Sequence, residues 1–222
     1  MTTSKSAQSN AKNRSVTVPP AKSGLERCAW PGIGDPLYAR YHDEEWGVPV
    51  GDDRALFEKL ILEGFQAGLS WLTILKKREN FRRAFHGFDA DRMARYSARD
   101  VARLMDDAGI VRNRLKIEAA IGNARAFIDL QQHDSLGALL WGVAQQEASN
   151  QQRAPQHASD VPGATAASRK MSNLLKRKGF RFVGPTTVYA MMQSTGMVND
   201  HLANCHRRAA CAALRKGFSP PV

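Results

Sequence analysis

The sequence has no apolar run long enough to cross a lipid bilayer, and hydrophobic residues make up 43% of its 222 positions. That share is enough for one well-packed core, so we expect a globular protein with no membrane partner. The first 24 residues are polar, contain lysine but no acid, and lack the apolar stretch of a secretory signal. We predict that residues 1–24 form a disordered leader and that the protein is cytoplasmic.

Cysteine is also scarce, and the sequence has only Cys28, Cys205 and Cys211. An odd number of cysteines in a chain without an export signal argues against a disulfide framework. Metal ligation or free thiols are the remaining uses. Cys211 has no evident ligand partner and looks like a spare thiol.

Two Cys/His pairs stand near the ends of the folded region, Cys28 with His42 and His201 with Cys205. If His201 and Cys205 lie one turn apart on a helix, both can point at a single ion. Two thiolates and two imidazoles make a closed tetrahedral set that suits structural Zn²⁺, one ion per chain. The alternative is ordinary buried cysteines and surface histidines, and His206 is a rival donor.

Strand patterns are almost absent, and helical periodicity dominates from residue 35 to residue 130, so the predicted fold class is all-α. Ser97 and Asp100, for example, form a capping pair at the start of one predicted helix. Residues 144–167 are rich in Gln, Ala, Ser and Pro, which predicts a surface loop. We therefore expect one domain over residues 25–206 and a basic flexible tail over 207–222.

The formal charge of +11 suggests a polyanionic partner, but most of the excess lies near the two ends of the chain. Two local clusters are more informative: "RNRLK" at 112–116 and "KRKGFR" at 176–181, each beside a glycine-bearing turn. In the stretch "FRFVGPTTVYA", the turn at Gly184 and the helix start at Thr186 offer backbone amides to a phosphate. Arg112 and Arg114 are candidates for a second backbone contact, or they belong to a solvated helix face.

One acid occupies a helix face that is otherwise apolar, because Leu56, Leu60 and Glu63 are spaced at i, i+4 and i+7. Five aromatic residues gather in the same third of the chain, namely Trp30, Tyr38, Tyr41, Trp46 and Trp71. A carboxylate beside several ring faces can hold a planar cation by stacking, cation–π attraction and a charged hydrogen bond. The alternatives are a core of aromatic residues and a structural acid paired with an arginine or a backbone turn.

Several blocks of the sequence resemble the 3-methyladenine DNA glycosylase I family of the helix-hairpin-helix glycosylase superfamily. The blocks are "RCAW", "DPLYARYHDEEWGVP", "LFEKLILEGFQAGLSWLTILKKRENFRRAF", "DAGIVRNRLKIEAAIGNARAF" and "KGFRFVGPTTVYAMMQSTGMVNDH". They run in order from Arg27 to the zinc candidate Cys205, leaving out the ends and the predicted loop. The resemblance implies a helix-hairpin-helix glycosylase fold in which a zinc site joins the N- and C-terminal parts.

The same resemblance implies roles for individual residues. Glu63 contacts a base swung out of the duplex, Leu69 fills the gap left in the DNA, and the metal ligands are Cys28, His42, His201 and Cys205. The pocket for the base is lined by Tyr38, Tyr41, Trp46 and Trp71, with Trp30 nearby. The implied substrate is double-stranded DNA that contains 3-methyladenine, with no nucleotide cofactor, and we expect a monomer.

The segment "VNDH" places Asn199 where the superfamily usually has a catalytic aspartate, and Asp200 one position later. We expect Asp200 to be the N-cap of a helix that bears His201 and Cys205. No lysine lies between "VGPTT" and "VNDH", so a Schiff base is not expected and the abasic site is left uncut. The alternatives are an inert DNA-binding module and a relative with a different base preference.

Overall fold

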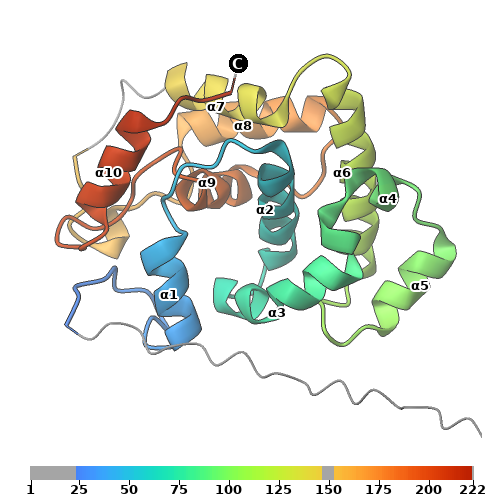
Figure 1. Ribbon diagram of the computed structural model, residues 1–222, viewed down its shortest axis with the longest axis horizontal. Coiled ribbons are helices and arrows are strands. Elements are labelled where there is room, and N and C mark those ends of the chain that lie inside the picture. The colour runs from blue at the N-terminus through green and yellow to red at the C-terminus, as the bar shows by residue number, and fades with distance from the viewer. Residues whose placement is uncertain (1–23, 147–152, 222) are drawn as a thin grey trace, which may run out of the picture.

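The computed structural model describes residues 24–146 and 153–221, and every regular element among them is helical (Figure 1). The elements are α1 (Pro36–Glu44), α2 (Asp53–Gln66), α3 (Trp71–Ala84), η1 (His86–Phe88), α4 (Ala90–Ala94), α5 (Ala98–Asp106), α6 (Arg114–Gln131), α7 (Leu136–Gln146), η3 (Ala158–Asp160), α8 (Ala166–Arg177), α9 (Pro185–Ser194) and α10 (Arg208–Gly217). The predicted all-α class is confirmed. The predicted leader lies, up to residue 23, outside the described residues.

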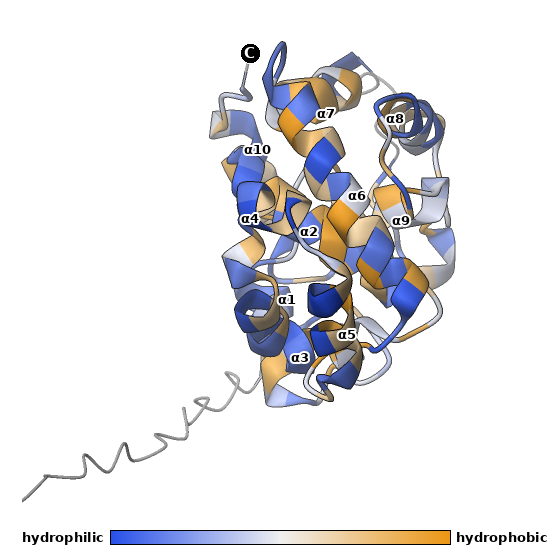
Figure 2. Cartoon of the chain, turned by 90° about the vertical axis from the view of Figure 1, so that its right-hand side faces the viewer, coloured by the Kyte–Doolittle hydropathy of each residue, from blue (hydrophilic) through white to orange (hydrophobic). Residues whose placement is uncertain are grey.

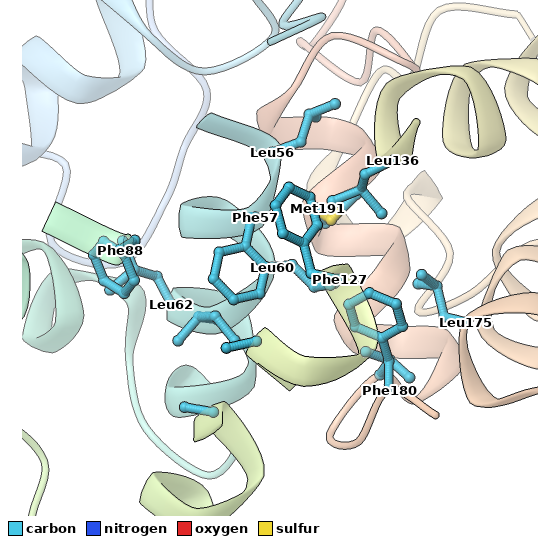
Figure 3. Close-up of a cluster of buried hydrophobic side chains, with 14 of the residues drawn as sticks. Leu56, Phe57, Leu60, Leu62, Phe88, Phe127, Leu136, Leu175, Phe180 and Met191 are labelled. Atoms are coloured by element: carbon cyan, nitrogen blue, oxygen red, sulfur yellow. The ribbon is translucent and has the colours of Figure 1, made fainter. Parts of the chain in front are cut away.

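Helix α2 is at the centre of the fold and packs against α3, α6, α7 and α9. In Figure 1 it stands between α1 and α10 on one side and α4, α5 and α6 on the other. Figure 3 shows how side chains of several helices meet around it, including Leu56, Phe57, Leu60, Phe127, Leu136 and Met191. Most helices carry both hydrophilic and hydrophobic stretches, as expected of helices with one buried face (Figure 2).

Short polar residues begin the helices that carry the core. The side chains of Asp52 and Ser70 accept hydrogen bonds from the first turns of α2 and α3. The predicted pairing of Ser97 with Asp100 is confirmed as a capping box at the start of α5. Each cap satisfies backbone donors that the helix itself leaves unpaired.

The prediction of a flexible tail from residue 207 is wrong for Arg208–Gly217, which forms α10. Cys211 on this helix is completely buried, and the Phe218 ring packs on Trp141 with 4.7 Å between centroids. The segment is rich in alanine and basic residues, so the sequence showed its charge more clearly than the short apolar face that the helix buries. The folded domain therefore continues past residue 206 to at least Phe218.

The predicted loop at 144–167 is narrower than expected, because α7 runs to Gln146 and α8 begins at Ala166. Residues 147–152 lie outside the described residues. Within the rest, η3 is the one regular element. Among the helices of the described chain, none has both the length and the apolar character needed to span a membrane.

Candidate functional site

A cavity of about 350 Å³ opens between α1, α2, the start of α3 and the segment after α9. Its lining includes Glu63 and all five aromatic residues singled out from the sequence: Trp30, Tyr38, Tyr41, Trp46 and Trp71. The volume is in the range of small-molecule sites. The structure thus brings together the acid and the rings that the sequence left spread over 42 positions.

Glu63 lies inside this cavity wall with only 3% of its surface exposed. Among the described residues, one hydrogen bond reaches its carboxylate: the Ser194 hydroxyl donates to Oε1 at 3.3 Å. No arginine pairs with it in the described chain. Burial raises the pKa of Glu63 to about 7, although Lys59 and the Ser194 hydrogen bond act in the opposite direction.

The aromatic walls are in contact with one another. The Trp30 ring lies 5.1 Å from Tyr38 and 4.7 Å from Trp46, and Tyr41 lies 5.5 Å from Trp71, measured between centroids. Burial raises the pKa of Tyr41 well above its usual value, so its hydroxyl stays protonated. The buried indole N–H of Trp71 finds no acceptor in the part of the chain that the structure describes. The cavity is therefore lined by ring faces and by the carboxyl groups of Glu63 and Asp200.

Beside the cavity, Cys28, His42, His201 and Cys205 form a buried cluster that could hold a metal ion. Their donor atoms all lie within 4.8 Å of one another. Cys205 Sγ is 3.4 Å from His42 Nε2 and 3.3 Å from His201 Nδ1, and Cys28 Sγ is 3.6 Å from His201 Nδ1. These separations match the edge of about 3.5 Å that tetrahedral Zn²⁺ bonds of about 2.3 Å to sulfur and 2.0 Å to nitrogen require.

A second layer of contacts turns both imidazoles toward this cluster. His42 Nδ1 lies 2.9 Å from Asp43, which also pairs with Arg27, and His201 Nε2 lies 3.1 Å from the Trp46 carbonyl oxygen. Because these partners accept hydrogen bonds, the N–H groups point outward and the lone pairs face the thiols. The donor types and their orientation therefore fit a metal ion.

The helical arrangement expected for His201 and Cys205 is wrong, because the segment from 199 to 207 contains turns and no helix. Asp200 is accordingly not an N-cap. It accepts hydrogen bonds from the Tyr189 hydroxyl at 2.5 Å and Gln193 Nε2 at 2.8 Å, and it lines the cavity. Contacts from α10 hold the segment instead, since Arg208 donates to the carbonyl oxygen of His201.

Leu69 is 39% exposed on a short turn between α2 and α3. The turn is closed twice: the Leu69 amide donates to the Gln66 carbonyl at 2.7 Å, and the Gln66 side chain donates to the Leu69 carbonyl at 2.7 Å. Gly68 supplies the positive φ of 82° that the turn needs. A rigid turn therefore presents an apolar side chain to solvent.

The hairpin between α8 and α9 is held by a side chain of α6. The buried Asn123 side chain accepts from the Arg181 amide at 2.7 Å and donates to the Arg181 carbonyl at 3.0 Å. Gly184 precedes α9 with φ −62° and open space around it, so the fold does not itself demand glycine there. The first turn of α9, which includes the exposed Thr186, receives no side-chain cap.

The two arginines of the "RNRLK" cluster are exposed, as a role in binding requires, but the lysine of that cluster is not. Arg114 lies 3.7 Å from Glu118, one turn along α6. Lys116 is buried, and its ammonium donates to the carbonyl oxygens of Phe65 at 2.9 Å and Ala67 at 2.5 Å. Lys116 thus caps the C-terminal end of α2 instead of facing a partner.

Sequence reasoning missed three residues that shape the site: Ser194, Lys59 and Asn123. A signal existed for Lys59, which stands one helical turn before Glu63. No signal in the sequence pointed to Ser194, which lies 131 positions from Glu63.

Comparison with known proteins gives consistent results. A family model described as methyladenine glycosylase matches residues 30–208. DNA-3-methyladenine glycosylase 1 of Escherichia coli is 48% identical over 182 residues, which cover 82% of this chain and 96% of that protein. A crystal structure of 3-methyladenine DNA glycosylase I superposes with a TM-score of 0.76 at 46% identity, covering 82% of this chain and 98% of the other.

A further solved structure contains the base itself. It is a variant of 3-methyladenine DNA glycosylase I in complex with 3-methyladenine, with a TM-score of 0.72 and 37% identity, covering 78% of this chain and 93% of that chain. Helix α10 begins where the family match ends, so most of it lies outside the shared segment.

Proposed function

Since this chain belongs to the methyladenine glycosylase family, we propose that it hydrolyses the bond between deoxyribose and 3-methyladenine in double-stranded alkylated DNA. The observation that carries the proposal is a carboxylate, Glu63, almost fully buried in an aromatic cavity of about 350 Å³. An inert DNA-binding module would have no use for an acid in such a place.

The chemistry of the substrate explains why little acid catalysis is needed. Methylation at N3 gives adenine a formal positive charge in the nucleotide, so the glycosidic bond is already weak. The enzyme must extrude the nucleotide, at a cost of a few kcal/mol, and select the damaged base. Ring faces with one anion at their edge favour a cationic purine over neutral adenine.

The ionisation of Glu63 adds to this selection. With a pKa of about 7, the carboxyl is near half-ionised at neutral pH when the cavity holds no charge. A cationic base lowers the pKa of a neighbouring carboxyl, whereas neutral adenine does not. A damaged base therefore gains an ion pair that an undamaged base cannot induce.

We propose that the Glu63 carboxylate also stabilises the positive charge that develops on the sugar as the base leaves. Water completes the hydrolysis. No lysine is among the residues of the described chain that line the cavity, so we propose a monofunctional enzyme that leaves an intact abasic strand.

For DNA binding, we propose that Gly184 and Thr186 receive a phosphate at the start of α9, where the amides are uncapped and the approach is open. Leu69, exposed on its rigid turn, enters the gap left by the extruded nucleotide. Arg112 and Arg114 contact the DNA backbone nearby.

We propose that Cys28, His42, His201 and Cys205 bind one structural Zn²⁺ per chain. Such an ion would tie the N-terminal segment to the segment after α9, both of which line the cavity. Its role would be structural, because all four ligands would come from the protein. We further propose a monomer in a reducing cytoplasm, where the three cysteines stay out of disulfides.

The test is to incubate the purified protein with methylated duplex DNA and to measure released bases by chromatography. The wild-type protein should release 3-methyladenine, and Glu63→Gln should release at least tenfold less, because loss of one charged contact to the reacting base costs 1.4 kcal/mol or more. Strands should break only after alkali treatment.

Glu79→Gln is a matched control, since Glu79 is an exposed acid on α3. It should release base at the wild-type rate. If Glu63→Gln folds and retains full activity, the assigned role of Glu63 is wrong. If the wild-type protein binds DNA and releases no base, the binding module is the correct alternative, and release of a different base would indicate altered preference.

A further inference from the structure

Lys59 lies one turn before Glu63 on α2. Its ammonium is 5.0 Å from the centroid of the Tyr41 ring and 5.2 Å from that of Trp71. Both rings line the cavity, whereas Lys59 is not among the described residues that do. The ammonium is therefore held against two rings that also bound the cavity.

Ion pairing does not account for this lysine. The neighbouring cations on α3 are each matched with an acid: Arg78 with Glu45 at 2.5 Å, and Arg82 with Glu58 at 2.7 Å. Lys59 is half-buried and forms no ion pair within the described chain. A half-buried ammonium loses hydration, and burial lowers the pKa of Lys59 for this reason. Two cation–π contacts offset only part of that cost.

The other groups around Glu63 cannot supply a positive charge. Helix α1 contributes the neutral hydroxyls of Tyr38 and Tyr41, and α9 contributes the Ser194 hydroxyl. The segment after α9 contributes the acidic Asp200, and the N-terminal segment contributes the thiol of Cys28. Arg78 of α3 is engaged by Glu45. Lys59 is the cation that acts on Glu63.

We propose that Lys59 is a positioning residue: its ammonium, placed over the Tyr41 and Trp71 rings, raises the ionised fraction of Glu63, the form that receives a cationic base. This rests on the proposed function of Glu63. The lysine acts through the ring wall and does not touch the base. It offsets the burial of the carboxylate without occupying the site, so the incoming purine remains the direct partner of Glu63.

The test is the pH profile of kcat/KM for release of 3-methyladenine, measured from pH 5 to pH 9 and corrected for spontaneous release. The acid limb should follow the ionisation of Glu63. In Lys59→Met, which removes the charge but keeps a side chain of similar length, the acid limb should move to higher pH by about one to two units. That is the interaction of two charges about 6 Å apart at an effective dielectric constant of about 20 to 40. Release on the acid limb should then fall by at least about tenfold and recover as the pH approaches 9.

Lys59→Arg should keep the wild-type limb, because it restores the charge. Lys76→Met, which removes an exposed ammonium on α3, should not move the limb. A second measurement does not depend on turnover: the titration of ¹³C-labelled glutamate carboxyls by NMR, with the Glu63 signal assigned by its absence in Glu63→Gln. Its midpoint should rise in Lys59→Met, or in Lys59→Gln if the methionine variant does not fold.

The proposal would be overturned if the acid limb and the Glu63 titration stayed unchanged in folded Lys59→Met or Lys59→Gln. An equal shift in Lys59→Arg would also overturn it. Failure of the underlying function has a different signature. In that case Glu63→Gln would retain the wild-type acid limb, whatever the Lys59 variants do.

Discussion

Replacing Glu63 by glutamine should stabilise the protein at high pH, because the buried carboxylate costs stability when it ionises. Burial raises its pKa from 4.5 to about 7. A group whose pKa is raised by folding contributes stability below its unfolded pKa and loses it as pH rises through the folded pKa. At 1.36 kcal/mol per pKa unit, ionisation of Glu63 should lower the unfolding free energy of the wild type by about 2–3 kcal/mol between pH 5 and pH 8. The variant lacks the carboxyl and should not show this loss.

The assay is urea unfolding of the wild type and of Glu63→Gln at pH 5 and pH 8. The difference in unfolding free energy between the two proteins should change by about 2–3 kcal/mol in favour of the variant as pH rises. Other titrating groups are common to both proteins and cancel in this comparison. A difference that stays constant across the two pH values would refute the reasoning, since Glu63 would then have the same pKa folded and unfolded.

Two predictions concern the metal cluster and the DNA contacts. Cys205→Ala should lose the one zinc per chain, measured by elemental analysis, together with several kcal/mol of unfolding free energy. Cys211→Ala should keep the metal, because the Cys211 sulfur lies 3.5 Å from His201 Nε2, the ring nitrogen that points away from the cluster. Metal-free wild-type protein with unchanged stability would exclude the metal site. Arg112→Ala should weaken DNA binding and lower the steepness of log K against log salt concentration by about one, measured by fluorescence anisotropy. An unchanged slope would assign Arg112 to a solvated face.

The helices and the pocket were largely predictable because their signals are local. The spacing of Leu56, Leu60 and Glu63 placed the acid on the buried face of α2, and all three are buried. The five aromatic residues could be expected near Glu63 from their density in one stretch of sequence. The hydrogen bond from Ser194 to Glu63 joins distant segments and leaves no periodic signal in the sequence.

Two errors have a common physical cause. The tail prediction failed because α10 is stabilised by tertiary burial of Cys211, which the charged sequence of that segment does not reveal. The helix expected at His201 and Cys205 failed because turns bonded to Arg208 hold those ligands instead. In both cases long-range contacts outweigh local propensity, and propensity was the only quantity that the sequence offered.

The end of α2 couples the parts of the molecule that must act together. Within seven residues it carries Glu63 in the base cavity, Gly64 so close to the hairpin that a Cβ there would lie 3.4 Å from Phe182, and Leu69 on its rigid turn. Lys116 holds the carbonyl oxygens between them and ties the end of α2 to α6. These contacts make the position of Glu63 depend on that of the hairpin and of the Leu69 turn. Under the proposed function, extrusion of a nucleotide and recognition of its base would therefore depend on the same element.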